Sequence, residues 1–329
     1  MTQAILVTGG AGYIGSHVVR QLGEQGHQIV VLDNLSTGFR ESVLHGELII
    51  GDTGDKELIK DILGRYNIQS VLHFAAHIVV PESVADPLKY YRNNTCNTRN
   101  LLECCQQAGV KHFIFSSTAA VYGIPDQALC VEDMPTSPIN PYGSSKLMSE
   151  WMLQDLAAAS DLRYTILRYF NVAGADPEAR IGQSTPNATH LIKVANEAVV
   201  GIRDTISIFG TDYPTEDGTC VRDYIHVEDL ASAHLHALDY LTAGGESVVL
   251  NCGYGHGYSV REVLDTVERV SGKTLKIIED KRRAGDPPAL AANADKIRQT
   301  LGWVPKYDNI DLIVDTALQW ERKLKNINL

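Results

Sequence analysis

Short apolar runs alternate with longer amphipathic segments through the first half of the chain. The apolar runs fall at residues 5–7, 29–32, 48–50, 71–74, 112–115 and 164–167. A helix is predicted after the first run, over about residues 16–24. Apolar strands separated by helices are typical of a parallel sheet that helices cover on both faces, with right-handed crossovers. We therefore predict an α/β fold with a doubly wound parallel sheet.

The pattern changes after residue 171. Residues 171–187, 210–218 and 282–292 read as long irregular loops, which in compact enzymes usually carry binding function. A helix at 227–241 and an apolar strand at 248–251 nevertheless resume the first pattern. We expect two interleaved domains: residues 1–171 with about 223–251, and about 172–222 with 252–329. The second domain is expected to be a smaller, mixed α/β lobe.

Composition narrows the class of protein. In 329 residues, 29 Lys and Arg face 40 Asp and Glu, and the net charge of −11 argues against a nucleic-acid partner. No apolar run approaches the roughly 18 residues that span a bilayer, so no membrane association is expected. The chain enters its first strand without a leader-like segment, and its six cysteines show no CxxC or metal-site spacing. We expect a cytoplasmic protein with reduced thiols and no metal.

A glycine-rich turn follows the first predicted strand. It places Gly9, Gly12 and Gly15 between that strand and the next helix. Glycines at such a turn let the backbone approach a pyrophosphate, and the helix N-terminus stabilises the phosphate charge. Asp33 ends the second strand, where a carboxylate accepts hydrogen bonds from the adenosine ribose of NAD and repels the 2′-phosphate of NADP. We therefore expect NAD as the cofactor.

A second group of residues points to proton transfer. Tyr142 and Lys146 are four residues apart in a helix predicted to begin after Pro141, so they share one helix face. A phenol is a poor base at neutral pH, but a neighbouring ammonium lowers its pKa. Ser116 and Thr118 follow the strand at 112–115 with hydroxyls that can bind a substrate oxygen. Each pattern alone is common; in this order they indicate a site that moves a proton and a hydride.

Several segments together resemble the UDP-galactose 4-epimerases of the extended short-chain dehydrogenase/reductase superfamily, which has a Rossmann-type fold. These segments are TGGAGYIGSH, LDNLSTG, HFAA, FSSTAAVYG, PYGSSK, RYFNVAGA, IFGTDYPTEDGTCVRDYIHVEDL and RRAGDPPAL. The match spans nearly the whole chain. The resemblance implies an isomerase of carbohydrate (galactose) metabolism that keeps NAD bound and interconverts UDP-glucose and UDP-galactose without net redox change.

The same resemblance implies a mechanism. Tyr142 takes the proton of the sugar 4-hydroxyl while hydride leaves carbon 4 for nicotinamide. Lys146 bonds the nicotinamide ribose and lowers the phenol pKa, and Thr118 holds the sugar oxygen. The 4-keto sugar then turns about its link to the diphosphate and accepts hydride on its opposite face. The first domain is expected to bind NAD and the second to bind the UDP-sugar.

The resemblance also implies two sets of contacts. Cofactor contacts are expected at Gly9, Gly12, Tyr13, Ile14, Gly15, Asp33, Asn34, Leu35, Ser36, Thr37, Gly38, Asp52, Thr53, Phe74, Ala75, Ala76, Asn93, Ser116, Tyr142, Lys146, Tyr169 and Phe170. Substrate contacts are expected at Thr118, Tyr142, Asn171, His190, Leu191, Phe209, Arg222, Arg283, Asp286 and Leu290. The arginines suit the diphosphate. For Arg222, the plainer alternative is a local ion pair with Asp223.

Four positions depart from the family pattern. Where this chain has His190, many members have an Asn that contacts the diphosphate. Where it has Ile78, many members have Lys. Thr118 replaces the commoner Ser and keeps the hydroxyl. Leu290 stands where a large Tyr in some members excludes 2-acetamido sugars and small residues admit them. The sequence therefore leaves open whether N-acetylated UDP-sugars are accepted and whether His190 contacts the diphosphate.

Alternatives to UDP-hexose epimerisation stay open at this point. The substrate can be another UDP-sugar, such as UDP-N-acetylglucosamine, a UDP-pentose or a UDP-uronate. A 4,6-dehydratase generally carries Asp-Glu after the catalytic Thr, where this chain has Ala119 and Ala120. A non-catalytic NAD-binding protein would usually have lost the Tyr or the Lys. The family also implies a homodimer through the Tyr-Lys helix and a helix at residues 90–107.

Overall fold

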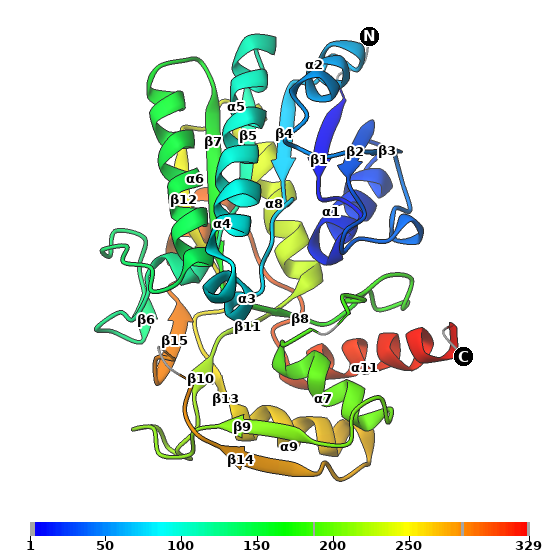
Figure 1. Ribbon diagram of the computed structural model, residues 1–329, viewed down its shortest axis with the longest axis vertical. Coiled ribbons are helices and arrows are strands. Elements are labelled where there is room, and N and C mark those ends of the chain that lie inside the picture. The colour runs from blue at the N-terminus through cyan, green and yellow to red at the C-terminus, as the bar shows by residue number, and fades with distance from the viewer. Residues whose placement is uncertain (1–3, 187, 284–285, 328–329) are drawn as a thin grey trace.

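The computed structural model describes residues 4–186, 188–283 and 286–327, so the first three residues lie outside it. Its largest element is a seven-stranded parallel sheet in the order β12-β7-β5-β4-β1-β2-β3. These strands are β1 Ile5–Thr8, β2 Ile29–Asp33, β3 Glu47–Ile50, β4 Ser70–His73, β5 His112–Ser116, β7 Arg163–Tyr169 and β12 Val248–Cys252. The sheet confirms the predicted doubly wound α/β fold (Figure 1).

Helices cover both faces of this sheet. Helices α1 (Tyr13–Glu24) and α8 (Val227–Thr242) pack on one face, and α2 (Lys56–Arg65), α5 (Asn97–Ala108) and α6 (Pro141–Ala158) pack on the other. The strands alternate between the two cores: Val7 and Val31 face α1 and α8, whereas Leu6 and Leu32 face the opposite helices. This alternation explains why the strands read as continuous apolar runs, because neither face meets water.

A smaller group of strands and helices lies below the carboxyl ends of the main strands in Figure 1. One sheet has the order β13-β10-β15-β6, and two strand pairs are β11-β8 and β14-β9. The strands are β6 Leu129–Cys130, β8 Asn171–Ala173, β9 Ile206–Phe209, β10 Val221–Arg222, β11 Tyr224–His226, β13 Tyr258–Ser259, β14 Ile277–Asp280 and β15 Ala289–Ala292. The helices are α7 Leu191–Val199, α9 Val260–Ser271, α10 Asp295–Leu301 and α11 Ile310–Ile327.

Short helices complete the description. Helices α3 (Val80–Ala85) and α4 (Pro87–Tyr90) are followed by a π-helix at Tyr91–Cys96 that runs into α5. Single 3₁₀ turns lie at Arg40–Ser42 and Ala119–Val121. None of the described helices is long and apolar enough to cross a bilayer.

The predicted elements differ from the observed ones in their bounds. Helix α1 begins at Tyr13, about three residues earlier than predicted, because Gly12 already has the extended conformation of a helix cap. The helix expected over 90–107 is interrupted by the π-helix. Strand β6, at 129–130, pairs with β15 of the smaller lobe although it precedes residue 171. The division of the chain into an NAD domain and a UDP-sugar domain stays a prediction.

Candidate active site

The glycine turn lies between β1 and α1 and is tightly packed. Gly9 has a φ of +73°, and a Cβ there would come within 2.6 Å of the Ala75 backbone nitrogen. A Cβ on Gly15 would lie 2.3 Å from the Gly9 carbonyl oxygen. Gly12 begins α1 without a side-chain cap, and the first turn of α1 holds no acidic residue. The helix amides and their positive dipole therefore remain available for an anion.

Asp33 is held beside this turn. Its side chain is nearly buried at the end of β2, and its two oxygens accept hydrogen bonds from the backbone amides of Ala11 at 3.0 Å and Leu35 at 2.8 Å. Burial raises the pKa of this carboxyl, and the two amide donors oppose that rise. The carboxylate is thus fixed in orientation with lone pairs to spare, as a ligand for vicinal hydroxyls requires.

A polar cluster follows the neighbouring strand ends. Asp52, after β3, accepts hydrogen bonds from the Asn34 side chain at 2.9 Å, the Gly54 amide at 2.7 Å and the Asn97 side chain at 2.8 Å. Thr53 beside it is buried. Asn34 also accepts a bond from the Ser36 amide, which orders the start of the 34–38 loop. The structure thus brings the expected contacts after β2 and β3 together.

The segment after β4 packs against the glycine turn. Phe74 packs against His234 of α8 with ring centroids 4.7 Å apart, so its side chain is committed to packing and its backbone borders the turn. Ala75 lies against Gly9, as its close approach requires. Asn93 donates to Asn94 at 3.0 Å, and Asn94 in turn binds the backbone of His77. Ile78, which stands where many family members have Lys, is exposed.

The residues expected to transfer a proton meet at the carboxyl end of β5. Asn140 caps α6 by accepting the Gly143 amide at 2.9 Å, and Tyr142 and Lys146 are both buried. The Lys146 ammonium donates to the Ser116 carbonyl at 2.8 Å and lies 4.9 Å from the centre of the Phe115 ring. Helix α6 therefore holds both side chains against the end of β5.

Hydroxyl groups surround this pair. The Ser116 hydroxyl donates to the Tyr169 hydroxyl at 2.9 Å. Thr118 accepts the Ala120 amide at 3.2 Å and so caps the 3₁₀ turn at 119–121. A Cβ on Gly143 would lie 2.6 Å from the Ala120 carbonyl oxygen, which shows how closely the start of α6 approaches that turn. The predicted Thr-Tyr-Lys constellation is thus brought together in space.

Without cofactor or substrate, burial opposes the ionised forms that the expected mechanism needs: the phenolate of Tyr142 and the ammonium of Lys146. Burial raises the pKa of Tyr142, and a hydrogen bond with Thr118 counteracts this. Burial also lowers the pKa of Lys146 to about 7, while the charge of Glu150 raises it. Desolvation is the largest effect on this phenol, and the expected lowering of its pKa by Lys146 is not found in the protein alone.

The expected nucleotide contacts gather around β10 and β15. Arg222 pairs in register with Leu290, and its guanidinium lies 3.5 Å from an Asp286 oxygen. The Asn171 amide, at the start of β8, donates to the Asp223 carbonyl at 3.1 Å. The guanidinium carbon of Arg283 lies 3.8 Å from the centre of the Phe209 ring, over its face.

The alternative prediction for Arg222, a local ion pair with Asp223, is wrong. Asp223 is fully buried and accepts the backbone amides of Tyr254, Gly255 and Ala292, so its carboxylate points away from a side-chain partner. Burial raises the pKa of Asp223 to about 6. Arg222 instead pairs with Asp286, 64 positions further along the chain.

The remaining expected contacts differ in exposure: one is a polar side chain on the surface, and the others are apolar side chains packed on the cores. His190 is exposed and occupies the N-cap position of α7, where its side chain makes no capping hydrogen bond. Its Nδ1 is 2.9 Å from the Gln183 side-chain nitrogen. Leu191 packs on the large core, and Phe170 and Leu290 pack together with Tyr122 in a small cluster beside the 3₁₀ turn. Leu290 therefore lies near the turn that Thr118 begins.

Two structural features escaped the sequence analysis. The Tyr13 hydroxyl donates to the Gly174 carbonyl at 2.6 Å, so its side chain binds the smaller lobe and only its backbone faces the helix terminus. Glu150 and Arg168 form a fully buried ion pair behind Lys146. The spacing of Glu150, four residues after Lys146, was a visible signal, because it places both on one helix face.

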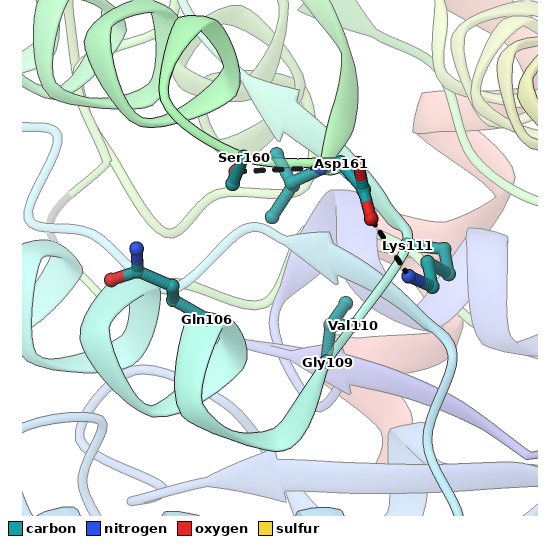
Figure 2. Close-up of a pocket in the computed structure, with 7 residues that line it drawn as sticks. Gln106, Gly109, Val110, Lys111, Ser160 and Asp161 are labelled. Carbon is teal, nitrogen blue, oxygen red and sulfur yellow. Dashed lines mark hydrogen bonds and ion pairs between the residues drawn. The ribbon is translucent and has the colours of Figure 1, made fainter.

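A pocket elsewhere on the molecule is not part of this site. This pocket has a volume of about 280 Å³. Figure 2 shows the residues that line it, among them Gln106, Lys111, Ser160 and Asp161. It lies where the chain enters β5 and β7, at their amino ends. Ligands of open parallel sheets bind outside the carboxyl ends of the strands, where the glycine turn, Asp33 and Tyr142 converge.

The features of this crevice fit a bound dinucleotide. Added side-chain atoms on Gly9 or Gly15 would collide with backbone, the α1 terminus is free of acidic side chains, and Asp33 is a fixed, buried acceptor. The first two suit a pyrophosphate, and the third suits a ribose without a 2′-phosphate. The residues present therefore fit NAD.

Comparisons with known proteins agree with this chemistry. A model of the family described as "NAD dependent epimerase/dehydratase family" matches residues 5–253. The UDP-glucose 4-epimerase of Azospirillum brasilense is 58% identical over 98% of this chain and 92% of its own, and that of Rhizobium meliloti (strain 1021) is 50% identical over 97% of each. The structure of UDP-glucose 4-epimerase from Brucella ovis in complex with NAD superimposes with a TM-score of 0.95 at 43% identity, covering 97% of this chain and 99% of that one.

A further solved structure broadens the comparison. The UDP-Glc/GlcNAc 4-epimerase of Campylobacter jejuni is 51% identical, with a TM-score of 0.87, and covers 98% of this chain and 99% of that one. With a family model over residues 5–253 and relatives matched over nearly their whole length, this chain belongs to the NAD dependent epimerase/dehydratase family and, within it, to the UDP-glucose 4-epimerases.

Proposed function

We propose that this protein is an isomerase that interconverts UDP-glucose and UDP-galactose by NAD-dependent epimerisation at carbon 4, through a transient 4-keto sugar. The observation that carries this proposal is the convergence of Tyr142, Lys146 and Thr118 at the carboxyl end of β5, beside a glycine turn that fits NAD. The high identity to UDP-glucose 4-epimerases along nearly the whole chain supports it.

The chain's own residues handle the proton and the orientation. The Tyr142 phenol oxygen accepts the proton of the sugar 4-hydroxyl and returns it after the sugar has turned. Thr118 lies within hydrogen-bonding reach of that phenol and orients the same oxygen. NAD supplies the reversible acceptance of hydride when bound. Because burial raises the Tyr142 pKa, nearby positive charge is required to make it a base, and Lys146 is the buried cation on the same helix face.

The UDP moiety is assigned to the smaller lobe. Arg222 and Arg283 would bind the diphosphate and Asp286 the ribose. Asn171 would be a further contact to the nucleotide. Strong binding through UDP leaves the sugar free to turn, which inversion at one carbon requires. Residues 172–222 and 252–329 then form the UDP-sugar lobe, and residues 1–171 with 223–251 form the NAD domain.

Turnover without added cofactor tests the proposal. The purified protein is incubated with UDP-galactose and the appearance of UDP-glucose is followed, beside the Tyr142→Phe variant. The wild type should turn over with the NAD it retains, and Tyr142→Phe should keep NAD but lose activity about 100-fold or more. A wild type that holds NAD without turnover would favour a binding protein, and an active Tyr142→Phe would remove the assigned base.

We also propose a homodimer. Apolar side chains are exposed on the helices that flank the sheet on the α6 side: Val84 on α3, Leu88 on α4, and Met148 and Trp151 on α6. Helix α6 contacts α3, α4 and α5, so these side chains belong to neighbouring helices. Light scattering should give twice the mass of the chain, and Trp151→Glu should give a monomer.

The cytoplasm is the proposed place of action. All six cysteines carry free thiols, and five of them are buried. Such thiols persist in a reducing compartment.

A further inference from the structure

Glu150 is a buried carboxylate directly behind the proton-transfer residues. It follows Lys146 by one turn of α6 and Tyr142 by two turns, and no part of its side chain is exposed. Its oxygens accept hydrogen bonds from Arg168 of β7, at 2.6 Å from one terminal guanidinium nitrogen, and from the Ser117 hydroxyl. A single acidic side chain thus joins α6 to the ends of two strands.

Further hydrogen bonds fix this ion pair. Arg168 also donates to the Tyr122 hydroxyl at 3.1 Å and stacks over that ring at 5.0 Å. Tyr122 donates to the Asn251 side chain at 2.7 Å. Because Tyr122 follows the 3₁₀ turn that Thr118 begins, the pair supports the backbone on which Thr118 is carried. Glu150 therefore cannot swing away from Lys146 without disrupting this network.

The position of Glu150 bears on the charge of Lys146. Among the described residues Lys146 forms no ion pair, and its ammonium donates only to the Ser116 carbonyl. A buried ammonium without a counter-ion tends to lose its proton. Glu150 supplies negative charge one turn away, and this charge raises the pKa of Lys146 against the effect of burial.

The other ionisable groups around this pair do not replace Glu150. From β4, His73 is buried and neutral, since burial and Lys146 lower its pKa to about 3. From β7, Arg168 is a cation and Tyr164 is a neutral phenol, and both face Glu150. From the α3–α4 side, Tyr90 is a neutral phenol near Tyr142. Glu150 is the anion among these groups.

We propose that Glu150 is a positioning residue that keeps Lys146 charged and holds Ser117 and Thr118 in place, so that Tyr142 can act as a base. The inference rests on the proposed epimerase activity, since it assigns a task to a residue that does not touch the substrate. Its distinguishing consequence is electrostatic: without the carboxylate, Lys146 becomes neutral at a lower pH and the Tyr142 phenolate is harder to form.

The test compares Glu150→Gln with the wild type as NAD-bound proteins. The ionisation of Tyr142 is followed by the ultraviolet absorbance of phenolate, after subtracting the same titration of the matching Tyr142→Phe protein. We expect the Tyr142 pKa to rise by about one pH unit and the alkaline limb of kcat/KM to move to lower pH by a similar amount. Glu150→Asp, which keeps the charge, should restore both in part.

Two further variants separate this role from mere support of the fold. Glu150→Gln leaves Arg168 as an unpaired buried cation, so the double variant Glu150→Gln/Arg168→Gln removes that charge as well. The double variant should regain stability while its Tyr142 pKa remains raised. Glu103→Gln, which removes a carboxylate from the more exposed Lys56 pair on α5, should change neither titration.

Each outcome decides the matter. An unchanged Tyr142 pKa in a Glu150→Gln protein that holds NAD overturns the proposal, and so does recovery of the wild-type pKa in the double variant. Loss of the fold in both variants would assign Glu150 a structural role only. The absorbance titration needs no turnover, whereas an inactive wild type would refute the proposed function instead.

Discussion

The hydroxyl of Tyr13 donates a 2.6 Å hydrogen bond to the carbonyl of Gly174, and this bond joins the helix of the glycine turn to the chain that follows Asn171. Gly174 has a φ of +86° and a Cβ there would lie 2.6 Å from the His226 ring, so the carbonyl is held in place. A residue at the expected cofactor site thus touches the segment expected to bind UDP.

Tyr13→Phe should therefore weaken UDP binding while NAD retention stays near normal, because the backbone of residue 13 is unchanged. Loss of the buried hydrogen bond should cost about 1 kcal/mol of the free energy of unfolding. Calorimetric titration with UDP and thermal unfolding measure the two effects. Tyr66→Phe, which removes an exposed hydroxyl bonded to Glu47, is the matched control and should change neither. Unaltered UDP affinity in Tyr13→Phe would deny the coupling.

Asp33→Ala should reduce the NAD retained through purification by about tenfold or more and relax the discrimination against NADP. The carboxylate fixes the Ala11 and Leu35 amides and presents its remaining lone pairs to the ribose. Bound nucleotide is measured by mass analysis of the denatured supernatant, followed by reloading with either cofactor. Unchanged selectivity between NAD and NADP would show that Asp33 only orders the loop.

Gly15→Ala should lower both stability and NAD retention. The added Cβ would lie 2.3 Å from the Gly9 carbonyl oxygen, a backbone atom that cannot give way without distorting the turn. The expected cost is about 1–3 kcal/mol of unfolding free energy. Gly64→Ala, in α2 with nothing within 4 Å, is the opposite case and should stabilise the protein by about 0.5–1 kcal/mol. Equal effects at both positions would contradict the packing argument.

Acid should weaken the protein through Glu228. Its carboxylate contacts His17 and Arg20, and despite the opposing effect of burial these partners lower its pKa from 4.5 to about 2. The folded value lies below the unfolded one, so the stabilisation is complete above pH 4.5 and is lost as the pH falls towards 2. The shift corresponds to about 3 kcal/mol. Denaturant unfolding should give Glu228→Gln a much lower free energy of unfolding than the wild type at pH 7, and a similar one near pH 2. A difference in unfolding free energy that does not change with pH would argue against this linkage.

How far the sequence could predict this structure depends on the kind of contact. The strands predicted at 5–7 and 29–32 were recognisable because burial on both faces makes every residue in these runs apolar. The pairing of β6 with β15 was not, since a two-residue strand whose partner residues lie 162 positions away carries no periodic signal.

The candidate site shows the same division. Tyr142, Lys146 and Thr118 were found because a helix repeat and a strand end fix their positions locally. The pairing of Arg222 with Asp286 and of Glu150 with Arg168 depends on how distant segments pack, and a buried charge looks like any surface charge in a sequence. Desolvation of Tyr142 likewise emerges only from the packed structure.

Leu290→Ser should shift substrate preference towards the 2-acetamido sugar. Leu290 packs with Phe170 and Tyr122 beside the turn that Thr118 begins, and its backbone pairs in register with Arg222. It therefore lies near both the residues expected to transfer the proton and those expected to bind the nucleotide. A smaller side chain makes room for the acetamido group without altering either. The ratio of kcat/KM for UDP-N-acetylgalactosamine over that for UDP-galactose should rise by about tenfold. Leu129→Ser, on the adjoining strand β6 with its side chain exposed, controls for a general effect of the substitution. A ratio that stays constant in Leu290→Ser would mean that this leucine does not limit the size of the sugar pocket.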